Sequence, residues 1–183
     1  GPSDDPAVTA TRRKAMRNLM GTLLLSGGIP MITAGDEHGR TQHGNNNAYC
    51  HDSPLTWINW ELQPWQEDLL ATTKHLIKLR QELPALRPLK FGRFGETVTN
   101  ANQMDWYNAD GKEMEAEDWD NPNNRTLQYL AASTPKDEEF SRILLIVHGV
   151  ENTAEVVVPT HAGVTFYEPL WFSTNAAPKD IPG

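Results

Sequence analysis

The first apolar pattern along the chain predicts a helix. Asp5 followed by Pro6 is a favourable start, because aspartate caps free backbone amides and proline fits the first turn. Apolar residues then recur at helical spacing and are expected to form one apolar stripe on one face: Val8, Ala15, Met16, Leu19 and Leu23. Gly27, Gly28 and Pro30 are expected to end this helix.

The next apolar segments predict a strand and a second helix. Residues 31–34 are short and mostly apolar, which is consistent with a buried strand. No periodicity follows until Pro64, which is expected to open a helix that Pro84 stops, because the residue before proline resists helical geometry. The predicted apolar face of this helix consists of Trp65, Leu69, Thr72, Leu76, Leu79 and Leu83.

The second half of the chain has the pattern of a β-domain. Segments rich in β-branched and aromatic residues are separated by turn residues, and each predicts a strand. They are Met104–Tyr107, Thr126–Ala132, Ile143–His148, Glu155–Val158 and Val164–Glu168. The pattern favours an antiparallel, sandwich-like domain of under ~100 residues. The acidic stretch Asp110–Asp120 is expected to be a loop.

Charge and composition narrow the functional classes. The 183 residues have a formal net charge of -8, which argues against a nucleic-acid binder and offers no basic stretch for an anionic membrane. Residues 1–100 have ten acids and eleven bases, whereas residues 101–183 have fourteen acids and five bases. This shift predicts two regions with a boundary near residues 84–90. A single cysteine, Cys50, favours a reducing cytoplasm.

The long aperiodic segment after the predicted strand is the candidate for chemistry. Long loops in compact domains are often functional, and residues 34–52 contain carboxylates, asparagines and Tyr49. These groups suit a polyhydroxylated ligand. If the helix–strand–helix belongs to an α/β barrel, Asp36 and Glu37 lie at the carboxyl end of the strand, where barrel enzymes place their active sites.

Structural interpretations of the same residues stay open. Asp36 and Glu37 could satisfy backbone amides, and turn formation is the favoured interpretation of Asn45–Asn47 at roughly two to one. The three histidines near Cys50 (His38, His43 and His51) have no recognised zinc spacing, so no metal is expected. Cys50 is expected to be a core or loop thiol rather than a nucleophile.

The remaining aromatic and acidic residues have two interpretations as well. Trp57 and Trp60 could stack on sugar rings or pack the loop, whereas Trp65 lies on the apolar stripe of the second helix and is expected to pack. The acidic residues of 110–120 do not match a calcium-binding EF-hand loop, so a solvated loop is expected.

Several motifs together resemble those of the α-amylase superfamily, in its glycogen debranching, isoamylase-type branch. The strongest are the runs Gly28–Glu37, Arg40–Gln42 and Gly44–Tyr49, followed by Trp57–Glu61. The opening residues Gly1–Pro6 also resemble that branch, and three later segments do so more loosely: Met104–Trp106, Asp118–Trp119 and Trp171–Thr174.

The resemblance implies an α+β fragment of a larger enzyme. Residues 1–88 are expected to be the last helix–strand–helix of a (β/α)8 catalytic barrel, and residues 89–183 an antiparallel β-sandwich domain. The family is a retaining glycosidase whose three catalytic carboxylates lie on barrel strands four, five and seven. This chain is expected to begin after strand seven and so to be inactive alone.

The resemblance also implies a substrate and a set of rim residues. The intact enzyme is expected to hydrolyse α-1,6 branch linkages in glycogen or limit dextrin, without a cofactor, and to need the missing barrel portion as partner. Glu37, Arg40, Asn46, Asn47 and Tyr49 are expected at the rim of its active site as glucan-contacting or loop-ordering residues. Substrate preference is open because four positions depart from the family pattern: Gly27, His43, His51 and Asn59.

Two other functions remain in view. One is a non-catalytic glucan-binding or interaction module, in which the β-domain and its tryptophans, Trp106 and Trp119, hold a polysaccharide. The other is a fragment of an enzyme that transfers or isomerises α-glucans.

Overall fold

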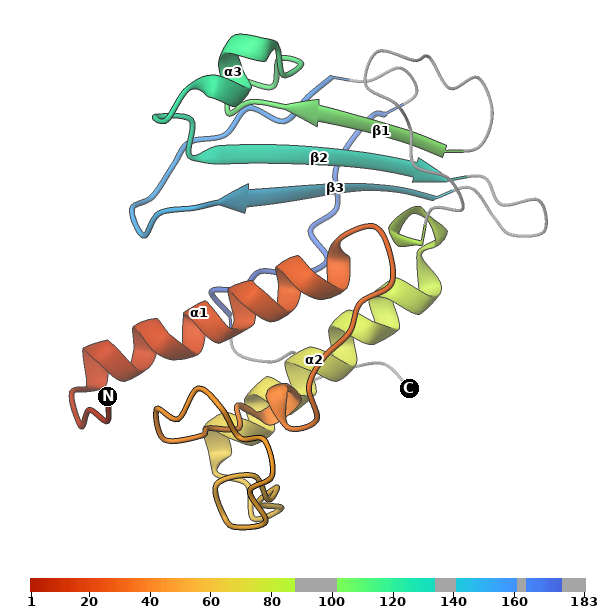
Figure 1. Cartoon of the computed structure of the whole chain (residues 1–183). Helices are drawn as coiled ribbons and strands as arrows, with labels where there is room; N and C mark the ends of the chain where they lie inside the picture. Colours follow the sequence, from red (N-terminus) through yellow and green to blue (C-terminus); the bar gives the residue numbers. More distant parts are fainter. Residues whose placement is uncertain (88–101, 134–140, 161–163, 176–183) are drawn as a thin grey trace. The chain divides into compact units, whose positions relative to one another are not determined.

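The computed structural model describes residues 1–87, 102–133, 141–160 and 164–175, and within them the chain is a small α+β structure (Figure 1). It divides into two compact units. The first consists of Gly1–Leu79 together with the segment from Leu170 onward, and the second is Arg80–Pro169.

The first helix, α1, has the predicted bounds, and its buried residues differ from its apolar stripe. It runs from Pro6 to Leu25, and the carboxylate of Asp5 accepts a hydrogen bond from the amide of Ala7 at 2.8 Å. Three residues of the predicted apolar stripe, Met16, Leu19 and Leu23, line the same apolar pocket. Leu19 is nevertheless 71% exposed, and the buried residues of α1 are Met20, Gly21, Leu24 and Leu25.

The segment that begins at Leu170 lies along α1. The guanidinium of Arg17 donates from Nε to the carbonyl of Ser173 at 2.7 Å. A methyl group at Gly21 would lie 2.5 Å from the indole of Trp171, so this helical position has no room for a side chain. A contact 150 residues away in sequence therefore determines which face of α1 is buried.

The strand predicted at residues 31–34 is wrong. These residues are neither strand nor helix, and Met31 is 83% exposed. A strand is stable only when its backbone pairs with a neighbour, and the three-stranded sheet of the described residues does not include this segment. A 3₁₀ turn, η1 (Asp36–His38), follows it.

The second helix, α2, confirms the prediction from the two prolines. It spans Pro64–Glu82, and the 3₁₀ turn η2 (Pro84–Leu86) follows. Arg87 covers its end, because the guanidinium donates to the carbonyls of Arg80 and Gln81 at 2.9 and 3.0 Å. The buried positions include four of the predicted ones: Leu69, Thr72, Leu76 and Leu79. No helix in the described residues is both long and apolar enough to cross a bilayer.

The second unit is built on one antiparallel sheet, in which β2 (Thr126–Ser133) lies between β1 (Asn102–Tyr107) and β3 (Ser141–His148). These three strands confirm the predictions for Met104–Tyr107, Thr126–Ala132 and Ile143–His148. Tyr129 is opposite both Trp106 and Leu145 in the register. It forms a core cluster with Ala85 of η2 and Ala131.

The other two predicted strands, at Glu155–Val158 and Val164–Glu168, are wrong, because both segments are irregular. Val157 is held instead by isolated bonds: its amide donates to Ala109 at 2.8 Å, and its carbonyl accepts from the buried side chain of Gln128 at 2.8 Å. The same Gln128 amide group donates to Asn108 at 2.7 Å. A side chain thus ties this segment to the sheet where a strand ladder was expected.

The acidic segment 110–120 is predicted to be a loop, and this prediction is wrong in part. The segment contains the short helix α3 (Ala116–Asp120). Glu115 and Asp118 form a capping box at its start, in which each side chain accepts from the other residue's backbone amide. A capping box needs only local contacts, so the pattern Glu115–Asp118 was the signal that could have predicted α3.

Candidate functional site

The segment after α1 forms a tight turn around η1. Gly35 and Gly39, which flank η1, have positive φ angles of 100° and 73°, a region that favours glycine. The Arg40 amide donates to the carbonyl of Gly35 at 2.9 Å and closes the turn. Backbone geometry therefore determines where the side chains of Glu37 and Arg40 begin.

Both carboxylates of η1 bind backbone amides. Asp36 accepts from the amide of Thr33 at 3.1 Å, and Glu37 accepts from the amide of Gly35 at 2.8 Å. The second carboxylate oxygen of Glu37 lies 4.0 Å from Nε2 of His38. In this structure the two acids thus order the turn, which is the structural role that the sequence left open.

Arg40 connects η1 to the loop that follows. Its guanidinium donates to the side-chain oxygen of Gln42 at 2.7 Å and to the carbonyl of Thr56 at 3.4 Å. Gln42 in turn donates to the carbonyl of Asn45 at 2.8 Å. These bonds link the start of the loop to its asparagine run.

The asparagine run consists of consecutive turns. The side chain of Asn45 accepts from the amide of Asn47 at 2.8 Å, and that of Asn47 accepts from the amide of Tyr49 at 3.1 Å. Asparagine commonly makes such turns with the amide two residues on. Asn46 and Tyr49 are exposed, Tyr49 by 83%, so their side chains are open to solvent.

Two residues of α2 hold η1 in place, and sequence reasoning missed both. Gln66 donates to the carbonyl of His38 at 3.0 Å, and the hydroxyl of Thr73 lies 3.5 Å from the carbonyl of Glu37. Gln66 and Thr73 lie about 30 residues from η1 in sequence, so no local pattern signals these bonds. His38 itself is buried.

The tryptophans near the loop have different environments. Trp65 packs beside Gly39, where a methyl group would lie 2.7 Å from its ring, and the Arg13 guanidinium is 5.7 Å from the ring centroid. Trp65 therefore packs, as expected. Trp57 and Trp60 are 58% and 76% exposed, and the Trp57 indole donates to Asp52 at 2.8 Å.

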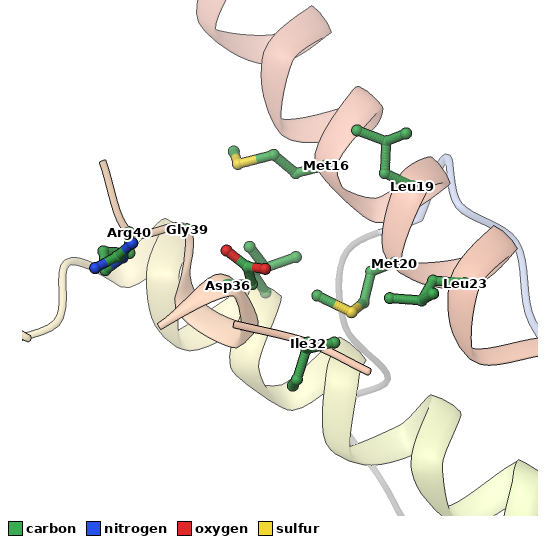
Figure 2. A pocket seen from close by; sticks show the side chains of 9 residues that line it. Met16, Leu19, Met20, Leu23, Ile32, Asp36, Gly39 and Arg40 are labelled. Carbon is green, nitrogen blue, oxygen red and sulfur yellow. The ribbon is translucent and has the colours of Figure 1, made fainter. Parts of the chain in front are cut away.

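An apolar pocket of about 300 Å³ lies between α1 and η1 (Figure 2). Figure 2 shows that Met16, Leu19, Met20 and Leu23 come from α1, whereas Ile32 and Asp36 face them. The other lining residues are Gly39, Arg40 and Leu69. The lining is mostly hydrocarbon, which suits an apolar protein surface better than a sugar.

The five predicted rim residues all lie on the segment from η1 to Tyr49. Glu37 and Arg40 are both close to Gly35, and the Arg40–Gln42–Asn45 bonds lead from there to Asn46, Asn47 and Tyr49. In the described ranges, no three histidine, cysteine or acidic side chains are grouped as a metal site requires. Cys50 is exposed.

The chain is similar over most of its length to bacterial proteins of glycogen metabolism. No protein-family model matches it. A protein of Mycobacterium tuberculosis named "Glycogen operon protein GlgX homolog" is 37% identical over 99% of this chain and 26% of its own length. Proteins named "Glycogen debranching enzyme" from Serratia proteamaculans and Cronobacter sakazakii are 36% and 39% identical over 87% and 84% of this chain.

These matches agree with the resemblance seen in the sequence motifs. The chain spans 22% and 21% of the Serratia and Cronobacter proteins, so it corresponds to only a part of them. The chain is thus similar to bacterial proteins named for glycogen debranching or the glycogen operon, and it spans about a fifth to a quarter of their length.

Proposed function

We propose that the full-length protein of this chain hydrolyses α-1,6 branch linkages of glycogen or limit dextrin in the cytoplasm. The observation that carries the proposal is the identity of 36–39% with proteins named for glycogen debranching, over 84–99% of the chain. The reaction is a retaining glycoside hydrolysis, which needs two carboxyl groups about 5–5.5 Å apart across the scissile bond.

The catalytic carboxylates are proposed to come from the full-length protein outside these 183 residues, so that this chain alone is inactive. Asp36 and Glu37 are poor candidates for the pair, because each accepts a hydrogen bond from a backbone amide of its own turn. In the full-length protein, residues 1–88 would complete a (β/α)8 barrel and residues 89–183 would form a β-sandwich domain.

The apolar surface of the first unit supports the missing barrel portion as partner. Ile29, Met31 and Leu19 are 94%, 83% and 71% exposed, and Leu19 also lines the apolar pocket. Large apolar side chains as exposed as these are typical of a surface that another protein part covers. Residues 31–34 would pair as a barrel strand once neighbouring strands are present.

The loop of residues 35–49 is proposed to form part of the substrate rim. Glu37, Arg40 and Asn47 would order it, because their side chains already make bonds within the loop. Asn46 and Tyr49 would contact glucan, because both are exposed. An amide offers donors and acceptors to sugar hydroxyls, and the tyrosine ring offers a flat apolar face.

The test is to assay the full-length protein and this chain side by side on glycogen limit dextrin. We expect the full-length protein to release linear malto-oligosaccharides and this chain to release none. Product analysis separates hydrolysis from transfer: longer or rebranched glucans without a gain in reducing ends would instead show a transferase. Reducing sugar released by this chain alone would contradict the proposal that the carboxylates lie elsewhere.

A further inference from the structure

Trp119 is an exposed aromatic residue on α3, a helix without a buried residue. It is 47% exposed, and none of the five residues of α3 is buried. Among residues 110–125, all described, it is the only large apolar side chain exposed to this degree. Figure 1 shows α3 beside the end of β1. A helix with no buried residue needs another explanation for its fixed position.

The residue next to Trp119 anchors α3 from three directions. The carboxylate of Asp118 accepts from the amide of Glu115 at 3.1 Å and from the side chain of Asn108 at 3.4 Å. Its carbonyl accepts from the side chain of Asn124 at 3.3 Å. Trp119 is therefore held on a fixed backbone although the helix is on the surface.

The indole of Trp119 is also positioned by the sheet. Its ring lies 5.8 Å from the Trp106 ring at an interplanar angle of 71°, and Trp106 lies 4.6 Å from the ring of the buried Tyr129. A near-perpendicular contact covers at most one face of the Trp119 ring. An indole in this setting is preorganised, so that binding a ligand would cost little side-chain freedom.

The surroundings of Trp119 determine the chemical class of ligand. Residues 110–120 contain six acidic side chains and one lysine, which disfavours nucleic acids and other polyanions. The exposed residues near it in sequence offer carboxylates and amides: Glu117, Asp120, Asn121 and Asn123. Exposed polar side chains close in sequence to an exposed aromatic ring suit a neutral ligand with an apolar ring face and many hydroxyls.

We propose that Trp119 and its exposed polar sequence neighbours form a glucan-binding surface on the second unit, separate in sequence from the 35–49 loop. The proposal rests on the proposed function for the identity of the polymer, an α-glucan such as glycogen. Its task is to hold the polymer while the enzyme acts on a branch elsewhere. Such a second contact raises the effective concentration of branches without touching the reacting bond.

Native affinity electrophoresis of this chain in gels with and without glycogen tests the surface. We expect glycogen to retard the chain, and Trp119→Leu to raise the apparent Kd at least about tenfold. Leucine keeps an apolar contact for Trp106 but removes the flat ring. Trp119→Phe restores a ring and should bind nearly as the original chain does.

The matched control is Phe166→Ala, which removes an aromatic residue of the same unit. Phe166 is 76% exposed and is not part of the Trp119–Trp106–Tyr129 group of rings. It should leave the retardation unchanged. Circular dichroism checks that each variant is folded. A chain that glycogen does not retard, or a folded Trp119→Leu variant that glycogen retards equally, would overturn the proposal.

A second experiment separates this surface from the proposed function. In the full-length protein, Trp119→Leu should raise KM for glycogen and leave kcat on a short branched oligosaccharide unchanged. A protein that binds glycogen through Trp119 but does not debranch it would refute the proposed function and leave the surface standing. If the original protein and the Trp119→Leu variant both debranch glycogen with the same KM, the glucan-binding surface is refuted and the proposed function stands.

Discussion

Gly35→Ala is expected to destabilise the first unit because the new methyl has no room. It would lie 2.8 Å from both Cβ and Cδ of Arg40. Cδ can rotate away, but Cβ is fixed to the backbone, and the bond from the Arg40 amide to the Gly35 carbonyl holds the two backbones together at 2.9 Å. Relief of the clash therefore requires the turn around η1 to open.

Two unfavourable contributions and one favourable contribution determine how much Gly35→Ala lowers the free energy of unfolding. A side chain at the φ of 100° of Gly35 costs about 1–3 kcal/mol, and overpacking costs about 1–3 kcal/mol more. Alanine also restricts the unfolded chain, which offsets about 0.4–1 kcal/mol. The net loss in the free energy of unfolding is then about 2–5 kcal/mol.

Gly44→Ala is the matched control. Gly44 also has a positive φ, 87°, but no heavy atom lies within 4 Å of the position of its new methyl. Only the conformational cost applies, so we expect a loss of about 1 kcal/mol. Urea unfolding followed by tryptophan fluorescence compares the two variants. Equal losses would refute the argument that Arg40 packing makes Gly35 irreplaceable.

Three further substitutions test the fold. Asp5→Ala should lower stability by about 1 kcal/mol through loss of the α1 cap, whereas Asp4→Ala should change thermal unfolding little. Leu130→Ala should cost about 2–5 kcal/mol in urea unfolding, because Leu130 is fully buried in the central strand; a loss below 1 kcal/mol would contradict this burial. Burial, with Asp105 and Glu113 nearby, raises the pKa of Tyr107 to about 12. The unfolded side chain ionises near pH ~10, so its stabilising contribution is complete below that pH and is lost as the pH rises to about 12. Tyr107→Phe should therefore flatten the alkaline fall in the urea midpoint, and an unchanged fall would exclude Tyr107 as its source.

Local chemistry in the sequence determined the bounds of α1 and α2 and the positions of β1, β2 and β3 along the chain. Asp5 and Pro6 start α1, and Pro64 and Pro84 flank α2, because capping and the missing proline amide act within one turn. The asparagine turns of residues 45–49 are equally local. For this reason the structural interpretation of that run could be reached without any coordinates.

Only the tertiary structure decided which surfaces are buried and which segments pair. Trp171 covers Gly21 of α1, a contact that no periodicity signals, whereas Leu19 of the apolar stripe is 71% exposed. Val157 lies in a sequence segment with strand composition, but its carbonyl accepts a hydrogen bond from the side chain of Gln128 instead of from a strand backbone. Residues 31–34 have strand composition, but the sheet of the described residues does not include them. Strand formation depends on another backbone and burial on another surface, and neither is encoded in the segment itself.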